Sequence, residues 1–433
     1  AALVAATQPA AATPVQDVHV SFLLPMSYVK GSGDCVAPDY LYDAEEPARC
    51  MLGGNSFRLV SASGMLGVEA FNARDGTYIP ALAELEGCDK RIKATLYDTA
   101  LSPSVAIKNV LNMLADSRPP DIIVGPAASS AAVPTALITG VMDIPQLTWW
   151  STSTQLDNVN NAPRFMRTIP SDGATAFFVC RYWKQEGYRF ASMIYLNENY
   201  GEAYKEELVR ECTSLGIKVH TFPFSVATAE SESTISAQVA AMSDTGTRVF
   251  LIVTNKDGYV EIINEAHRLG IAGAGTSWMV SDGITFDDIN SLSDEVKATV
   301  AGTLRIVAAG GTSNNDKFNR FAAGWSDFNA SVINDYFPAH WSVDSTFFTD
   351  TTAMDSMVKD VGTFFYDTIG MIGKMLCEIA PTGPLPAGFG TTFWDLKESV
   401  NITGLTGPVA FDDIGNRASR TATFEISNFA FDD

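Results

Sequence analysis

Four small hydroxyl residues follow two apolar, strand-like segments of the sequence, and their side chains are suited to hold an anion. Ser129 and Ser130 follow the first segment, and Ser151 and Thr152 follow the next one, directly after Trp150. Hydroxyl groups and free N–H groups at the start of a helix hold a carboxylate without needing a full positive charge. The alternative interpretation is that Ser129, Ser130 and Thr152 only cap the helices that follow them.

Two aspartates and a tyrosine, which lie later in the sequence than these hydroxyl residues, are suited to bind a cation. Asp172 lies in a Pro-Ser-Asp sequence, Tyr200 in Asn-Tyr-Gly-Glu and Asp282 in Ser-Asp-Gly. A carboxylate pairs with an ammonium group, and a tyrosine ring can face one. Each residue also has an ordinary interpretation: Asp172 as a helix cap, Tyr200 as a packing residue and Asp282 as part of a turn. Together with the hydroxyl residues, they predict a site for a small zwitterion that is held at both ends.

Apolar strands alternate with helical patterns through most of the chain. This alternation predicts an α/β fold in which mainly parallel, doubly wound sheets are flanked by helices. Strands are expected at 18–24, 91–97, 121–124, 146–149, 190–195, 218–221, 249–253, 277–280 and 303–307. Helices are expected at 56–73, 104–115, 130–139, 174–185, 202–215, 234–241, 258–269, 317–328 and 354–379. One open sheet of so many strands is unusual, so two lobes are expected.

The expected division places residues 1–16 in a disordered leader. Lobe 1 is expected to contain residues 17–168 and 303–397, and lobe 2 residues 169–302 and 398–433. Ligands of doubly wound sheets bind beyond the carboxyl ends of the strands. The hydroxyl residues of lobe 1 and the acidic residues of lobe 2 are therefore expected to meet in the cleft between the lobes. A ligand that contacts both lobes favours their closure.

The charge of the chain excludes several classes of partner. Its 433 residues carry 29 Lys and Arg against 50 Asp and Glu, a net charge of −21 at pH 7. Such a charge repels nucleic acid and anionic membrane surfaces, and no apolar run is long enough to span a bilayer. Only four histidines occur, without a catalytic triad, a metal-ligand spacing or a dinucleotide-binding pattern. We therefore expect a protein that is not an enzyme and uses neither a metal nor a cofactor.

The cysteines and two glycosylation sequons favour the secretory pathway. Cys180 and Cys212 lie on consecutive predicted helices and are candidates for a disulfide. Cys377 lies on an apolar helix, where we expect a free buried thiol. The remaining cysteines, expected near the rim of lobe 1, where one pair could fasten the loop 26–55, are Cys35, Cys50 and Cys88. Sequons occur at Asn329 and Asn401.

Five segments carry a resemblance to a known family. They are Asp143–Ser153 (DIPQLTWWSTS), Arg164–Asp172 (RFMRTIPSD), Asn199–Glu202 (NYGE), Ser281–Gly283 (SDG) and Gly404–Arg417 (GLTGPVAFDDIGNR). In order and spacing they resemble the Venus-flytrap ligand-binding region of class C receptors, the metabotropic glutamate and GABA-B type, which has the type I periplasmic-binding fold. The resemblance extends from about Val18 to Phe429.

The resemblance implies a role for each candidate residue. Positions matching Ser129, the backbone of Trp150 and Thr152 hold the α-carboxylate of an amino acid in such receptors. Positions matching Asp172, Tyr200 and Asp282 hold its α-ammonium group. In such receptors a basic residue binds the side-chain carboxylate of glutamate, and no residue of this sequence matches it. Lys359 lies near the expected position but about two residues away from it. An aromatic distal pocket is expected from Tyr28, Trp149 and Trp150.

The resemblance therefore implies the extracellular ligand-binding domain of a membrane receptor, which binds an α-amino acid or similar zwitterion and signals by lobe closure. Its transmembrane part would lie outside this sequence. Association into a homodimer or heterodimer through lobe 1 is also implied. The alternative is a soluble substrate-binding protein that delivers an amino acid to a transporter. The gene sequence beyond Asp433 discriminates between the two.

Overall fold

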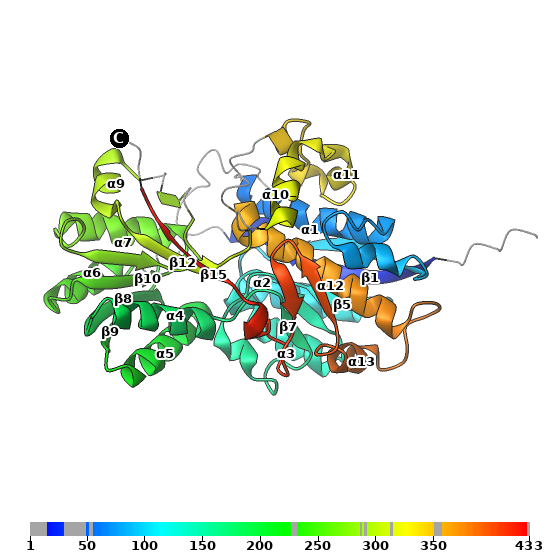
Figure 1. Ribbon diagram of the computed structural model, residues 1–433, viewed down its shortest axis with the longest axis horizontal. Helices are drawn as coiled ribbons and strands as arrows, with labels where there is room; N and C mark the ends of the chain where they lie inside the picture. The colour runs from blue at the N-terminus through cyan, green and yellow to red at the C-terminus, as the bar shows by residue number, and fades with distance from the viewer. Residues whose placement is uncertain are drawn as a thin grey trace, which may run out of the picture.

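Two lobes, each built on its own β-sheet, lie side by side in the computed structural model (Figure 1). The structure describes residues 15–29, 49–51, 55–226, 232–285, 288–289, 292–311, 315–349 and 357–430. None of the helices in these ranges is both long enough and apolar enough to cross a membrane.

The sheet of lobe 1 has five parallel strands in the order β4-β1-β5-β6-β7. They are β1 (Gln16–Leu24), β4 (Lys90–Asp98), β5 (Ile122–Val124), β6 (Gln146–Thr148) and β7 (Phe165–Arg167). The helices of this lobe include α1 (Asn55–Ala73), α2 (Pro103–Ala115), α3 (Ser129–Val141), α10 (Asp316–Ala323), α11 (Ala330–Asn334), α12 (Thr363–Ile379) and α13 (Phe389–Asp395). Two further pairs of short antiparallel strands are present. One pairs β2 (Ser27–Val29) with β3 (Arg49–Met51), and the other is the hairpin of β13 (Asn401–Gly404) and β14 (Gly407–Ala410).

The sheet of lobe 2 has six strands in the order β15-β12-β11-β10-β8-β9, all parallel except the edge strand β15. They are β8 (Phe190–Leu196), β9 (Lys218–Phe224), β10 (Val249–Val253), β11 (Ser277–Val280), β12 (Leu304–Ala308) and β15 (Phe424–Asn428). The flanking helices are α4 (Asp172–Gln185), α5 (Asn199–Ser214), α6 (Ile235–Asp244), α7 (Lys256–Arg268) and α9 (Asp294–Val300).

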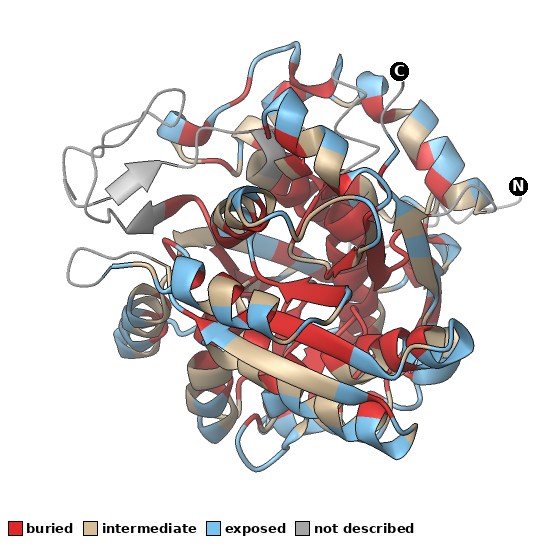
Figure 2. Ribbon diagram, turned by 90° about the vertical axis from the view of Figure 1, so that its left-hand side faces the viewer, coloured by how far each residue is buried: buried red, intermediate tan, exposed pale blue. Residues whose placement is uncertain are grey.

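Burial explains why the strands read as continuous apolar runs. All five residues of β10 are buried, as expected for a central strand covered by helices on both faces. Figure 2 shows the buried strands of lobe 2 beneath helices whose outer faces are exposed. In lobe 1, Gly64 on α1 lets this helix approach α12, because a Cβ atom there would lie 2.5 Å from the Phe365 ring.

The predicted α/β fold class is confirmed, and every predicted strand and helix has a counterpart: β10 and β11 have the predicted bounds, and the others have shifted ends. Strand β7 was not predicted, because its three residues directly precede the expected lobe boundary between residues 168 and 169. The long helix expected at 354–379 begins with a π-helical turn, Val358–Gly362, before α12. The helix expected at 317–328 ends at Ala323 and is followed by a 3₁₀ turn, Trp325–Asp327.

The lobe boundaries differ from the expected division in two places. Strand β12, expected in lobe 1, pairs with β11 and β15 and so belongs to the sheet of lobe 2. The hairpin β13–β14, expected in lobe 2, packs on lobe 1, since Ile402 and Val409 join its buried core. A strand's partner depends on contacts that are distant in the sequence, so a local pattern does not assign it to a sheet.

Two disulfides are present among the described residues. Cys180 and Cys212 are bonded between α4 and α5, which confirms the predicted pair. Cys377 is bonded to Cys88, so the expected free thiol is wrong: the start of β4 lies against α12 although 289 residues separate the two cysteines. Cys35 and the side chain of Cys50 lie outside the described part of the chain.

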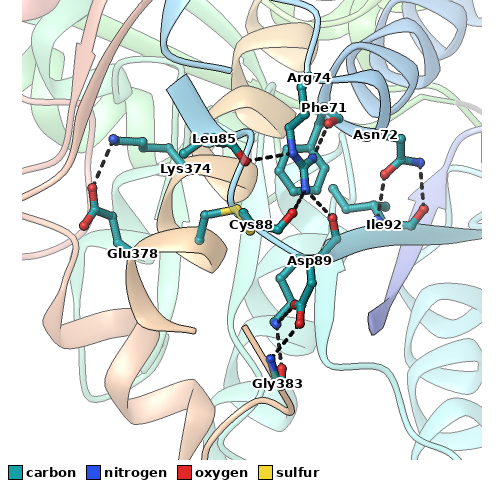
Figure 3. The surroundings of a disulfide bond; sticks show 12 residues. Phe71, Asn72, Arg74, Leu85, Cys88, Asp89, Ile92, Lys374, Glu378 and Gly383 are labelled. Carbon is teal, nitrogen blue, oxygen red and sulfur yellow. Dashed lines mark hydrogen bonds and ion pairs between the residues drawn. A yellow bond between two sulfur atoms is a disulfide. The ribbon is translucent and has the colours of Figure 1, made fainter. Parts of the chain in front are cut away.

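Arg74 fixes the backbone around the Cys88–Cys377 disulfide (Figure 3). Its guanidinium donates to the carbonyl oxygens of Leu85, Cys88 and Lys90 at 3.2, 2.8 and 2.6 Å. Beside it, Asp89 accepts a hydrogen bond from the Gly383 N–H at 2.7 Å, which holds the segment after α12 in place. This cluster therefore joins the sheet to the C-terminal helices of lobe 1.

Candidate functional site

A small cavity lies between the lobes and contains several of the predicted residues. Its polar lining comes from Trp150 and Thr152 of lobe 1, from Thr175 and Asp282 of lobe 2, and from Arg305 and Asp360 where the lobes join. A larger surface hollow lies elsewhere on lobe 1, near Lys374 and Asn401. It contains none of the predicted site residues, so the interlobe cavity is the candidate site.

Asp172 lies at the junction of the two lobes. It is the first residue of α4 and is 1% exposed, and its N–H donates to the Thr152 carbonyl at 2.9 Å. Its side chain does not cap α4, since Ser171 occupies the cap position. Burial, and next the charge of Asp282, raise the pKa of Asp172, although a hydrogen bond with Thr152 lowers it in part. Its buried Oδ2 atom has no hydrogen-bond partner among the described residues.

Tyr200 and Asp282 form the other half of this acidic cluster. The Tyr200 hydroxyl donates to Asp282 Oδ1 at 2.6 Å and lies 2.8 Å from Ser281 Oγ. Burial raises the pKa of Asp282, and burial together with the two carboxylates raises the pKa of Tyr200. Arg167 lowers the pKa of Asp172 and Arg305 that of Asp282, but burial outweighs both, so the positive charge near the two carboxylates compensates them only in part. Such a cluster favours a bound cation.

The hydroxyl residues of lobe 1 are not helix caps. Ala128 is the cap position of α3, so Ser129 and Ser130 are its first two helical residues. Ser129 Oγ accepts a hydrogen bond from the Ser153 N–H at 3.3 Å. Thr152 is buried and precedes Ser153, which caps the 3₁₀ turn Thr154–Asp157. The capping interpretation is therefore wrong for all three predicted residues.

Three predicted residues have surroundings that differ from a simple cleft position. The Ser151 hydroxyl donates a hydrogen bond to the Pro126 carbonyl at 2.8 Å, so it is used within lobe 1. Trp149 stacks on Phe365 at 3.8 Å in the core of lobe 1, so it does not form part of an aromatic distal pocket. Ser130 hydrogen-bonds to Glu198 of lobe 2. The side chain of Tyr28 lies outside the described residues.

Trp150 does line the cavity, and its ring lies 5.9 Å from that of Phe57 on α1. The backbone N–H of Trp150, which we expected to hold a ligand carboxylate, instead donates to the Thr148 hydroxyl at 3.4 Å. The indole therefore narrows the cleft on the side of lobe 1. It is the one member of the expected aromatic pocket that the described side chains place at the cavity.

A buried arginine positions the segment that carries Thr152. Arg167, at the end of β7, is fully buried and donates to the carbonyl oxygens of Ser151 and Ser153 at 3.2 and 2.9 Å. Its Nε donates to Asn416 Oδ1 at 2.6 Å, and Asp157 balances its charge. The segments Arg164–Asp172 and Gly404–Arg417, far apart in sequence, therefore meet beneath the site.

Sequence reasoning missed an ion pair that lines the same cavity. Arg305 Nη1 donates to Asp360 Oδ2 at 2.7 Å, and the two side chains are 3% and 9% exposed. Lys359, considered because it lies near the expected basic position, pairs with Glu425 at 3.3 Å instead. The available signal was an arginine inside the apolar strand Leu304–Ala308, since a charged residue is rarely buried without a partner.

The sequence matches a family model described as "Receptor family ligand binding region" over residues 84–430. It is similar to the metabotropic glutamate receptor-like protein E of Dictyostelium discoideum, with 24% identity over 308 residues. That match covers 68% of this chain and 34% of the relative. It is also 22% identical over 321 residues to glutamate receptor 3.1 of rice, covering 68% of this chain and 32% of that protein.

A third relative is the G-protein coupled receptor family C group 6 member A of Carassius auratus, 24% identical over 164 residues, covering 37% of this chain and 19% of the relative. The chain thus spans about a third or less of the length of these curated relatives. The two-lobed α/β architecture agrees with the type I periplasmic-binding-like fold of the matched family. The family model covers most of the chain, and the chain belongs to the receptor family ligand binding region, the family that includes class C receptor ectodomains.

Proposed function

We propose that this protein binds an α-amino acid, or a small zwitterion like it, in the cleft between its lobes and has no catalytic role. The observation that carries the proposal is the acidic cluster of Asp172, Tyr200 and Asp282 beside Thr152. Both carboxylates have a raised pKa, so a ligand ammonium supplies the charge that the cluster lacks. The hydroxyl groups of Ser129 and Thr152 lie on the opposite lobe, where the α-carboxylate would be bound.

Lobe closure is the signal that this arrangement supports. Contacts between the lobes already exist on this side: the Ser153 hydroxyl donates to the Asn199 carbonyl at 2.9 Å, and Asn199 Nδ2 donates to Gln155 Oε1 at 2.7 Å. A ligand held by residues of both lobes stabilises the closed arrangement by its differential affinity for it. We propose that this closure is transmitted to a membrane-bound part of a receptor, as the names of the relatives suggest.

An extracellular location is part of the same proposal. Two disulfides join elements within the two lobes, and structural disulfides persist in oxidising compartments. The sequon residues Asn329 and Asn401 are both exposed. Treatment of the protein from secreting cells with a glycosidase is expected to lower its mass.

A thermal-shift screen with the twenty amino acids and small amines tests the proposed ligand class. A ligand at about 100 times its dissociation constant stabilises the folded state by about 2.7 kcal/mol. The melting temperature is therefore expected to rise with at least one α-amino acid and not with the matching carboxylic acid without an amino group. A screen in which no amino compound shifts the melting temperature would overturn the proposal.

Thr152→Ala is expected to weaken amino-acid binding by about 1–3 kcal/mol, because a hydroxyl that bonds to a charged group is removed from a buried position. Isothermal calorimetry measures the loss. Thr299→Ala is the matched control, since the Thr299 hydroxyl donates only within α9, to the Val296 carbonyl at 2.7 Å. Equal affinities for the two variants would remove Thr152 from the ligand site.

A further inference from the structure

The basic residue found among those that line the cavity is already bound by a carboxylate. Arg305 is the one basic residue among those that line the cavity, and Asp360 binds it at 2.7 Å. Its Nε also donates to the Ile284 carbonyl at 2.5 Å, so the guanidinium is fixed on two sides. Arg58, Arg167 and Lys359 are not among the described residues that line the cavity.

The carboxylates of the cleft outnumber these cations. Asp282 and Asp360 line the cavity, and Asp172 lies close enough to Asp282 for their charges to interact. The Arg305–Asp360 pair is neutral as a unit, and Arg167 is balanced by Asp157. Arg167 and Arg305 offset the charges of Asp172 and Asp282 only in part, since burial still raises both pKa values, so a ligand cation is favoured here. A ligand with a second carboxylate would add a third negative charge to this site.

We propose that Asp360, by holding the Arg305 guanidinium, makes the cleft select amino compounds without an acidic side chain, with basic amino acids bound most tightly. The proposal rests on the proposed function, because it specifies the ligand of the same site. Rejection of a wrong ligand by an uncompensated like charge is an established route to specificity. Asp360 is a specificity-determining residue in this account because it binds Arg305, the one cation that a ligand carboxylate would meet among the described residues that line the cavity.

The first test uses ligand pairs and the unaltered protein. Glutamine and glutamate have nearly the same size and differ by one charge, as do norleucine and lysine in the opposite sense. Calorimetry is expected to show glutamine binding at least tenfold more tightly than glutamate, and lysine more tightly than norleucine. Glutamate binding as tightly as glutamine would overturn the proposal while leaving the proposed amino-acid site intact.

The second test frees the arginine. Asp360→Asn keeps the size of the side chain and removes its charge, so the affinity ratio of glutamate to glutamine is expected to rise at least tenfold. Asp360→Glu, which keeps the ion pair, is expected to retain the preference of the unaltered protein. The double variant Asp360→Asn with Arg305→Gln has no guanidinium to offer and is expected to lose the gain. An unchanged ratio in Asp360→Asn, with circular dichroism showing a folded protein, would overturn the proposal.

These outcomes are separable from failure of the proposed function. If no amino compound binds the unaltered protein or any variant, the cleft is not an amino-acid site, and the selectivity proposal is overturned with it. If amino acids bind and acidic ones bind best, only the role of Asp360 is overturned.

Discussion

Asp172→Asn is expected to weaken amino-acid binding strongly and, at the same time, to make the unliganded protein more stable at neutral pH. The variant removes the charge that pairs with the ligand ammonium. Loss of one partner of a buried charge pair costs about 2–5 kcal/mol of binding free energy, so the dissociation constant rises roughly 30-fold or more. Calorimetry with the tightest amino acid from the thermal-shift screen measures this loss, and unchanged affinity would contradict the assigned site.

The gain in stability follows from the sign of the pKa shift. Burial and the neighbouring Asp282 raise the pKa of Asp172 above its value in the unfolded chain. A carboxyl with a raised pKa holds its proton more tightly when folded, so its favourable contribution is present at low pH and is lost as pH rises through the raised pKa. The wild-type melting temperature is therefore expected to fall with rising pH above the ordinary carboxyl range. The Asn variant lacks this loss, so the difference between the two widens as pH rises.

Asp367→Asn provides the contrast: burial raises the pKa of Asp367 as well, but its carboxylate accepts hydrogen bonds that an amide cannot replace. Its carboxylate accepts hydrogen bonds from the Leu405 N–H at 2.7 Å and from the N–H and hydroxyl of Thr406 at 2.8 and 2.7 Å. An Asn amide would turn its NH₂ group toward one of these donors and leave it unpaired. This variant is expected to melt at a lower temperature and to bind the ligand normally. A destabilised Asp172→Asn protein would contradict the account of a carboxylate pair that is compensated only in part.

The order of strands and helices was predictable because it depends on local sequence. A strand such as β10 is apolar at every position since both of its faces are buried, and that pattern is visible without any knowledge of its neighbours. The residues after these strands were predictable for the same reason, since parallel strands end at one edge of a sheet. Thr152 and Asp282 were found in this way, whereas Asp172 was taken from the Pro-Ser-Asp sequence after the expected lobe boundary; the three lie together in the structure.

Features that depend on contacts between distant segments were not predictable. The Arg305–Asp360 pair joins β12 to the turn before α12. Taken alone, each residue is a single charged side chain in an apolar segment, and the sequence does not show that the two are partners. The sheet to which β12 belongs is decided by β11 and β15. Trp149 and Trp150 are adjacent and chemically identical, yet one stacks in the core and the other lines the cavity. The backbone turn that follows β6 points the two side chains into different surroundings.

The largest loss of stability is expected when the Cys88–Cys377 disulfide is removed by changing both cysteines to alanine. A disulfide restricts the unfolded chain, and the restriction grows with the length of the closed loop. This bond closes a loop with a sequence separation of 289, whereas Cys180–Cys212 closes one of 32. The chain-entropy relation gives about 5.7 kcal/mol for the first bond and about 3.7 kcal/mol for the second.

The two double variants control for each other, because each removes one disulfide and places two alanines at sites outside the cleft. Urea denaturation is expected to give the lower midpoint for the Cys88 and Cys377 variant. It is also expected to give a larger m-value, since the unfolded chain expands further and exposes more surface without the long-range link. Ligand affinity of the folded protein is expected to be unchanged in both. Equal midpoints and m-values would show that the long loop, which includes most of lobe 2, does not govern the contribution of this bond.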